Sequence, residues 1–119
     1  MQLQLVTLEQ AKKLKEMGFD WFTLHYYYNS NFDNYSLARR ECEKVLESEI
    51  PAPSVALALK WFRDEKRLNY SIESDLTKFG LHYEYDILGI TFNKVTKCDT
   101  YEVCESALLD AMLEYTEGK

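Results

Sequence analysis

Apolar side chains recur at helical spacing from the start of the chain. In the segment after Thr7, one face carries Leu8, Ala11 and Leu14. Thr7 and Gln10 have the spacing of a capping box, in which each side chain binds a backbone N–H of the first turn. Because Gly18 suits the left-handed conformation that often ends a helix, the pattern predicts a helix over residues 8–17.

Three later segments share this helical period. Residues 55–67 are almost entirely apolar in their first two turns, which predicts a helix at the centre of the core. A further helix is expected to begin near Asp99 or Thr100 and to keep an apolar stripe to the end of the chain. Residues 36–49 carry apolar side chains at helical spacing, so they are interpreted as a helix as well. Pro51 is expected to end it, because proline restricts the residue before it.

Other segments have the patterns of strands. Residues 68–73 and 81–87 alternate strictly between apolar and polar side chains, which is typical of half-buried antiparallel strands. The residues between them, 75–80, predict a hairpin, and a third strand is expected over 90–95. Residues 20–28 are rich in strand formers but bulky on both faces, which indicates a strand that is covered on both sides or lies at an interface.

The order of these elements predicts the fold class. Strands that are grouped between helices, instead of alternating with them singly, argue against a doubly wound parallel sheet. The length of 119 residues is typical of one domain. We therefore predict a single α+β domain over residues 1–119, with an antiparallel sheet of three to five strands and helices packed mainly on one face.

Charge and composition narrow the classes of partner. The net charge is −6, and residues 99–119 carry six carboxylates and one lysine. Without a basic cluster the chain is a poor candidate for direct binding to nucleic acid. No run approaches the ~18 apolar residues of a membrane span, and residues 1–6 lack the pattern of an export signal. Three cysteines without close pairs favour a reducing compartment, so we expect a cytoplasmic protein without a membrane partner.

Candidate chemistry is sparse. The soft metal ligands are His25, His82, Cys42, Cys98 and Cys104, and their spacing lacks the two close pairs of a zinc site. Neither histidine lies in a recognisable catalytic motif, although a Cys–His pair formed by the fold stays open. Glu73, Glu84 and Asp86 share one side of the predicted hairpin and are interpreted as its solvated face, with a cation site or a glycosidase-like carboxylate pair as the alternatives. We predict no catalytic residue, metal or cofactor.

Tyrosine is the residue type that stands out, with nine in the chain. Tyr26, Tyr27 and Tyr28 are consecutive, so a strand must show some of them on each face. Tyrosine offers a large amphipathic area at low entropic cost, and it is enriched at interfaces. We therefore predict a binding surface at these three residues and Trp21, with an aromatic core or a ring-binding pocket as alternatives.

The acidic side of the last helix is the second candidate surface, represented by Glu105 and Glu114. Such a pattern is usually a solvated helix face. The alternative is that these carboxylates dock on a basic surface, including one that normally holds nucleic acid.

Three stretches carry a resemblance to other proteins: TLEQAKKLKEMGFDW from Thr7, PAPSVALALKWFRDEK from Pro51 and TYEVCESALLDAMLEY from Thr100. In this order they resemble a group of small uncharacterised proteins from bacteriophages and mobile elements of gut anaerobic bacteria. The group has no known activity, so the resemblance implies only a context: a protein made inside a bacterial cell that binds a host protein.

Together these observations predict a non-enzymatic protein that binds a bacterial host protein, with inhibition of a host defence system as one such role. A small-ligand binder with a tyrosine-lined pocket for a nucleotide-like ring is the first alternative. An enzyme of unrecognised type that uses His25 or His82 is the second. Homo-oligomerisation is compatible with a strand that is aromatic on both faces.

Overall fold

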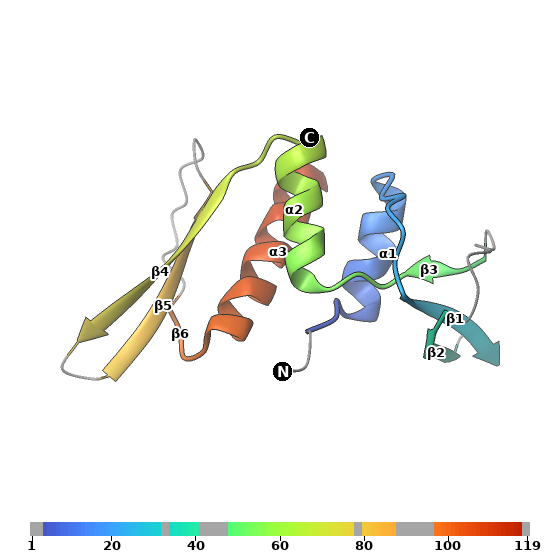
Figure 1. Ribbon diagram of the computed structural model, residues 1–119, viewed down its shortest axis with the longest axis horizontal. Helices are drawn as coiled ribbons and strands as arrows, with labels where there is room; N and C mark the ends of the chain where they lie inside the picture. The colour runs from blue at the N-terminus through green and yellow to red at the C-terminus, as the bar shows by residue number, and fades with distance from the viewer. Residues whose placement is uncertain (1–3, 32–33, 41–47, 78–79, 88–96, 118–119) are drawn as a thin grey trace. The chain divides into compact units, whose positions relative to one another are not determined.

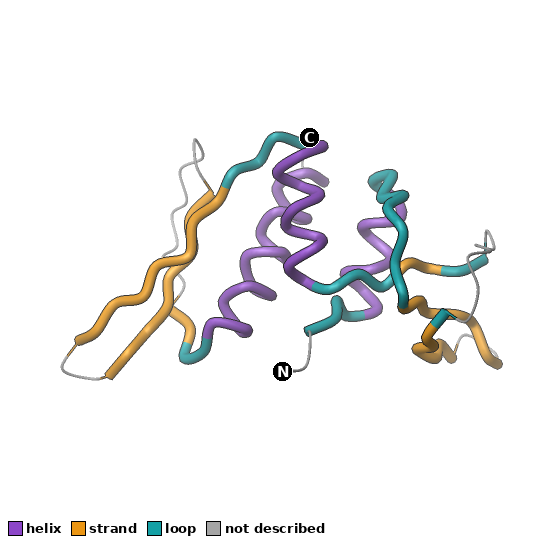
Figure 2. Tube along the Cα trace, viewed as in Figure 1, coloured by secondary structure: helices purple, strands orange, loops and turns teal. Residues whose placement is uncertain are grey.

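A computed structural model describes residues 4–31, 34–40, 48–77, 80–87 and 97–117 of the chain. The described residues form helices and antiparallel sheets, so the protein is of the α+β class, as predicted (Figure 2). By its contacts the chain divides into two compact units, Met1–Ser54 and Val55–Lys119, which are described separately. That the two units form one domain stays a prediction.

The first unit contains one helix and a three-stranded antiparallel sheet. The helix is α1 (Leu8–Glu16), and the strands are β1 (His25–Asn31), β2 (Asn34–Arg39) and β3 (Ile50–Pro51), in the order β2-β1-β3 (Figure 1). The central strand β1 pairs with both neighbours, so its side chains lie in the middle of each face.

Local signals define α1 at both ends. The Thr7 hydroxyl accepts a hydrogen bond from the Gln10 N–H at 3.2 Å, and the Gln10 side chain accepts one from the Thr7 N–H at 2.9 Å. Gly18 has a φ of +95°, and the Phe19 N–H donates to the Leu14 carbonyl at 3.0 Å. These bonds satisfy backbone groups that every helix end leaves free. The predicted helix, its capping box and its glycine stop are confirmed.

Two predictions in this unit need correction. The strand expected over 20–28 begins only at His25, because residues 20–24 form no strand and the chain bends at Leu24. The helix expected over 36–49 is wrong in its first part, since residues 34–39 form β2. Pairing with β1 binds the backbone N–H and C=O groups of this segment, and such tertiary pairing overrides a weak helical pattern. Residues 41–47 of that prediction lie outside the described residues, and its last two residues, Ser48 and Glu49, are not helical.

The second unit contains two helices and another three-stranded antiparallel sheet (Figure 1). Its elements are α2 (Val55–Glu65), β4 (Tyr70–Thr77), β5 (Gly80–Ile87), β6 (Lys97–Cys98) and α3 (Tyr101–Glu117), with strand order β4-β5-β6. The core helix, the hairpin and the last helix are confirmed. The third strand expected over 90–95 lies outside the described residues.

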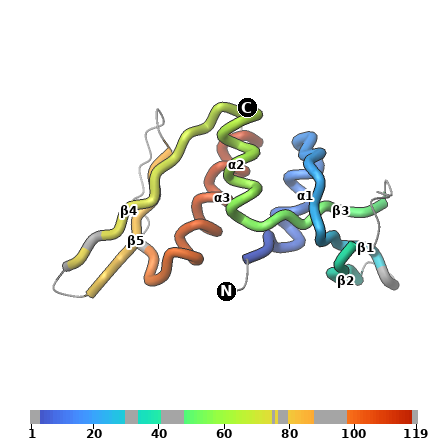
Figure 3. The backbone as a smooth tube through the Cα atoms, in the orientation of Figure 1, coloured from blue at the N-terminus to red at the C-terminus, as the bar shows by residue number. Residues whose placement is uncertain are grey.

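The hairpin strands differ from the prediction at their ends. Strand β4 begins at Tyr70 instead of residue 68 and continues through residues 75–77, where Thr77 pairs with Gly80. Figure 3 shows β4 and β5 running side by side. The register confirms the predicted faces, because Ile72 lies opposite Tyr85 on the apolar side. Helix α3 contacts this sheet and also α2, so it lies between the other elements of the unit. Its buried residues are Cys104, Leu108, Leu109, Met112 and Leu113.

The last helix begins at one of the two predicted positions. The Val103 N–H donates to the Thr100 hydroxyl at 3.2 Å, so Thr100 is the capping residue. In the part of the chain that the structure describes, no helix combines the length and the apolar character needed to cross a membrane.

Candidate binding site on the first sheet

The three consecutive tyrosines of β1 divide between the two faces of the first sheet. Tyr27 lies on the same side as α1, and its hydroxyl donates to the Val6 carbonyl at 2.9 Å. Burial raises the pKa of Tyr27. The Tyr26 and Tyr28 rings lie side by side on the opposite face, with centroids 6.1 Å apart and planes inclined by 50°. We call this opposite side of the sheet, which carries Tyr26 and Tyr28, the aromatic face.

The register identifies which residues share the aromatic face. Ala38 is the β2 partner of Tyr26, and Ser36 is the partner of Tyr28. Directly opposed residues in an antiparallel pair point to the same side. A pocket of about 410 Å³ opens on this face. It is lined by Tyr26, Tyr28, Asn29, Ala38, Ser48 and Glu49.

A buried ion pair lies beside this pocket. Arg40 follows β2 and Glu49 precedes β3, so the two residues approach from the strands on either side of β1. Arg40 Nη1 lies 2.7 Å from Glu49 Oε2, and the two side chains are only 4% and 8% exposed. Because charges lose their hydration when buried, such a pair is sustained only by close geometry and further hydrogen bonds.

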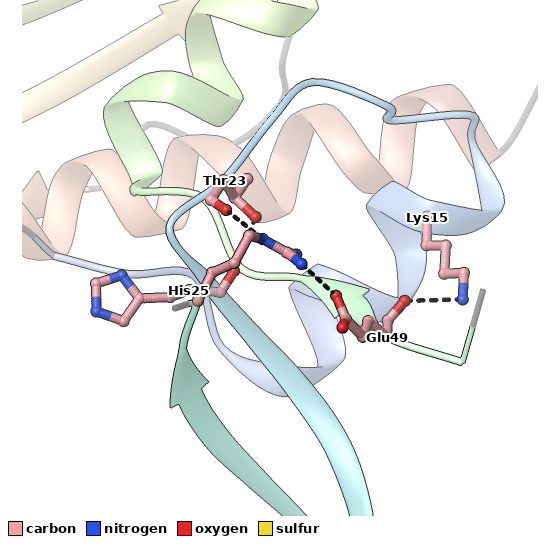
Figure 4. Close-up of polar contacts among 5 residues, drawn as sticks. Lys15, Thr23, His25 and Glu49 are labelled. Atoms are coloured by element: carbon pink, nitrogen blue, oxygen red, sulfur yellow. Dashed lines mark hydrogen bonds and ion pairs between the residues drawn. The ribbon is translucent and has the colours of Figure 1, made fainter. Parts of the chain in front are cut away.

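One further bond reaches the guanidinium, and two others hold the surrounding backbone in place (Figure 4). Arg40 Nε donates to the Thr23 carbonyl at 3.1 Å, and Lys15 Nζ donates to the Glu49 carbonyl at 3.0 Å. The Thr23 hydroxyl donates to the His25 carbonyl at 2.8 Å. The network therefore fixes the segment before β1 and the segment before β3 against each other.

The Arg40 guanidinium also stacks on aromatic rings. It lies 5.0 Å from the centroid of Tyr26 and 5.8 Å from that of Phe22. Cation–π attraction of this kind orients the ring as well as the cation. Tyr26 is thus held by Arg40, while Tyr28 and Phe22 are 39% and 56% exposed. The aromatic face is preorganised and accessible.

Sequence reasoning missed Arg40, Glu49 and Phe22. The two charged residues are nine positions apart and match no motif. Their meeting depends on strands that flank β1, and strand order leaves no local trace in a sequence. Phe22 was included only as part of an expected strand, although the bulk of residues 20–28 was the signal that led to Tyr26 and Tyr28.

The other predicted site residues lie elsewhere. Trp21 is half-buried, and its ring packs against Phe19 at 6.3 Å, next to the end of α1. Glu105 and Glu114 belong to α3 in the second unit. Burial, with repulsion from Glu102, raises the pKa of the half-buried Glu105, whereas Glu114 is exposed. The structure therefore brings together Tyr26 and Tyr28 of the predicted set.

Other candidate chemistry falls on the second unit. Glu73 lies directly opposite Glu84 in the hairpin, on the side away from the apolar pairs. Cys98 and Cys104 are both buried free thiols. Burial and a hydrogen bond with Cys98 raise the pKa of Cys104 to about 12. Among the residues that the structure describes, no three His, Cys, Asp or Glu side chains gather in an arrangement that would hold a metal ion.

Comparisons of the chain with protein-family models, with curated proteins and with solved structures find no match.

Proposed function

We propose that this chain is a non-enzymatic binding protein that uses the aromatic face of its first sheet to engage a bacterial host protein. The observation that carries the proposal is the adjacency of Tyr26 and Tyr28, which both line a pocket of about 410 Å³. Exposed aromatic anchors beside a pocket are the features that dominate the binding energy of protein interfaces. A host partner, with a defence protein as one class, is suggested by the resemblance of three stretches of the sequence to phage and mobile-element proteins.

The energetic reason is preorganisation. Binding costs free energy when mobile side chains must be ordered, at roughly 0.5–1.5 kcal/mol for each rotamer-rich side chain. The Tyr26 ring already rests on Arg40, which is itself tied to Thr23 and Glu49. A partner therefore meets a ring whose orientation is set before contact.

A second candidate function uses the same pocket. Its volume of about 410 Å³ lies in the range of small-molecule sites, and two aromatic rings line it. A nucleotide-like ring stacked on Tyr28 would suit such a site. Native mass spectrometry of the purified protein distinguishes the two functions, because a copurifying small molecule would favour ligand binding.

The direct test is affinity capture from a lysate of a bacterial host, read by mass spectrometry against an untagged control. We expect the wild-type chain to enrich one host protein and the double variant Tyr26→Ala/Tyr28→Ala to lose it. The matched control is Tyr35→Ala, which removes a tyrosine of the same sheet whose ring lies under Lys12 of α1 at 4.4 Å. Equal capture by the wild-type and double-variant chains, both folded by circular dichroism, would reject the aromatic face as the contact surface.

A further inference from the structure

We propose that the pocket on the aromatic face receives a cationic side chain, a lysine or an arginine, from the protein that binds there. This inference rests on the proposed function and names the chemistry of its central contact. Two observations support it: the groups that line the pocket, and the end of the Arg40–Glu49 pair that borders it.

The lining groups favour a cation. Two tyrosine rings inclined by 50° form the aromatic walls, and aromatic ring faces attract cations. The polar lining residues are Asn29, Ser48 and Glu49, which supply oxygen acceptors, and none of the described residues that line the pocket is basic. A positively charged group that entered between the rings would therefore meet acceptors and a carboxylate.

The orientation of the buried ion pair also favours a cation in the pocket. Glu49 lines the pocket, whereas its partner Arg40 does not. The Arg40 guanidinium is directed at the Thr23 carbonyl and the Glu49 carboxylate, so the two charges compensate each other and the carboxylate is the end of the pair that borders the pocket. An anionic ligand would face the carboxylate end of the pair and is disfavoured. A cation is favoured by the same geometry.

Arg40 also provides an internal example of the contact. Its guanidinium stacks on the Tyr26 ring at 5.0 Å, which shows that the aromatic face already accommodates this chemistry within the chain. The first unit carries eight Asp or Glu and six Lys or Arg over residues 1–54, and this net charge of −2 adds a weak long-range attraction for a basic partner. Both effects act on charge, so a neutral group of the same shape should bind poorly.

Two small probes that differ only in charge test this prediction. The full chain, labelled with ¹⁵N and ¹³C, is titrated by NMR with Nα-acetyl-arginine amide and separately with Nα-acetyl-citrulline amide, its neutral isostere. We expect saturable shifts at Tyr26, Tyr28 and Glu49 with the arginine probe, and binding of the citrulline probe weaker by about tenfold or more. Equal affinity for both probes, or no saturable shift with arginine, would overturn the proposal.

Variants of Tyr28 distinguish the ring from its hydroxyl. Tyr28→Phe keeps the aromatic face and should bind the arginine probe within about twofold of wild type, whereas Tyr28→Leu should weaken it about fivefold or more. Tyr35→Leu, on the other side of the sheet, should leave the affinity unchanged. If Leu and Phe at position 28 behave alike, cation–π contact with this ring is rejected.

Two further readings separate this inference from the proposed function. If a host protein is captured through Tyr26 and Tyr28 but the chain does not bind the arginine probe, the proposed function is supported and the cationic contact is rejected. Shifts of the same residues that depend on protein concentration alone would assign the pocket to a second copy of this chain, which also overturns the proposal.

Discussion

The two three-stranded sheets of this protein differ in how their faces are covered. In the second unit, β4 and β5 alternate between apolar and polar residues, and α3 packs against this sheet. In the first unit, the central strand β1 is bulky on both sides, α1 lies on the Tyr27 side, and Tyr26 and Tyr28 stay partly exposed. A sheet that packs against a helix on one face only has strands that alternate between apolar and polar residues. A sheet that carries large side chains on its second, accessible face can use that face to bind another molecule.

The two sheets also differ in what anchors them. The core of the second unit is apolar, with Phe62, Leu108 and Met112 fully buried. The first unit places a buried ion pair, Arg40 with Glu49, beside the pocket of its aromatic face. Apolar side chains can shift to fill the space that a small substitution leaves. A buried charge that loses its partner is neither hydrated nor paired, and this destabilises the folded state. The comparison therefore predicts different responses to mutation.

The largest effect is expected from breaking the ion pair. Arg40→Met leaves Glu49 buried without its partner and should lower the free energy of unfolding by about 3–5 kcal/mol. The double variant Arg40→Met/Glu49→Leu should recover most of this loss, because no buried charge remains. Urea unfolding followed by the fluorescence of Trp21, in a Trp61→Phe background, reports on the first unit.

An exposed ion pair is the control for this experiment. Lys60 lies 4.0 Å from Asp64, and the two side chains are 55% and 43% exposed. Lys60→Met should change stability by less than about 1 kcal/mol. A loss of similar size for Arg40→Met would mean that the buried pair does not anchor the first unit.

A somewhat smaller effect is expected in the apolar core of the second unit. Leu108 is fully buried on α3, so Leu108→Ala should cost about 2–5 kcal/mol through lost packing and the cavity left behind. Leu76, 78% exposed near the end of β4, is the matched control, and Leu76→Ala should cost less than about 0.5 kcal/mol. Trp61 in a Trp21→Phe background is the reporter, and equal costs for the two leucines would contradict the assigned core.

The smallest effect at neutral pH is expected from the ionisation of the Cys104 thiol, which destabilises the folded state only under alkaline conditions. The pKa of Cys104 is raised from 9.0 to about 12, so the folded state keeps its proton while the unfolded state loses it. The contribution of this thiol to stability is therefore complete below pH 9 and is lost as the pH rises toward 12. The free energy of unfolding of wild type should fall more steeply over this window than that of Cys104→Ala. Parallel pH profiles would contradict the raised pKa.

What the sequence determined by itself was the local structure. Helix α1 was predictable because its capping box, apolar stripe and Gly18 all lie within a dozen residues. The hairpin was predictable because period-two alternation defines both strands and their faces without knowledge of anything else. The two-sided bulk of residues 20–28 likewise indicated that tyrosines would appear on both faces of a strand.

Only the tertiary structure decided what depends on strand order and register. Residues 34–39 became β2 because β1 offered backbone partners, and no local signal encodes that choice. The separation of Tyr27 from Tyr26 and Tyr28, and the meeting of Arg40 with Glu49, both follow from the order β2-β1-β3. Propensity and capping act over a few residues, whereas a binding face is assembled from segments whose pairing is settled by the competition of the whole chain for hydrogen bonds and burial.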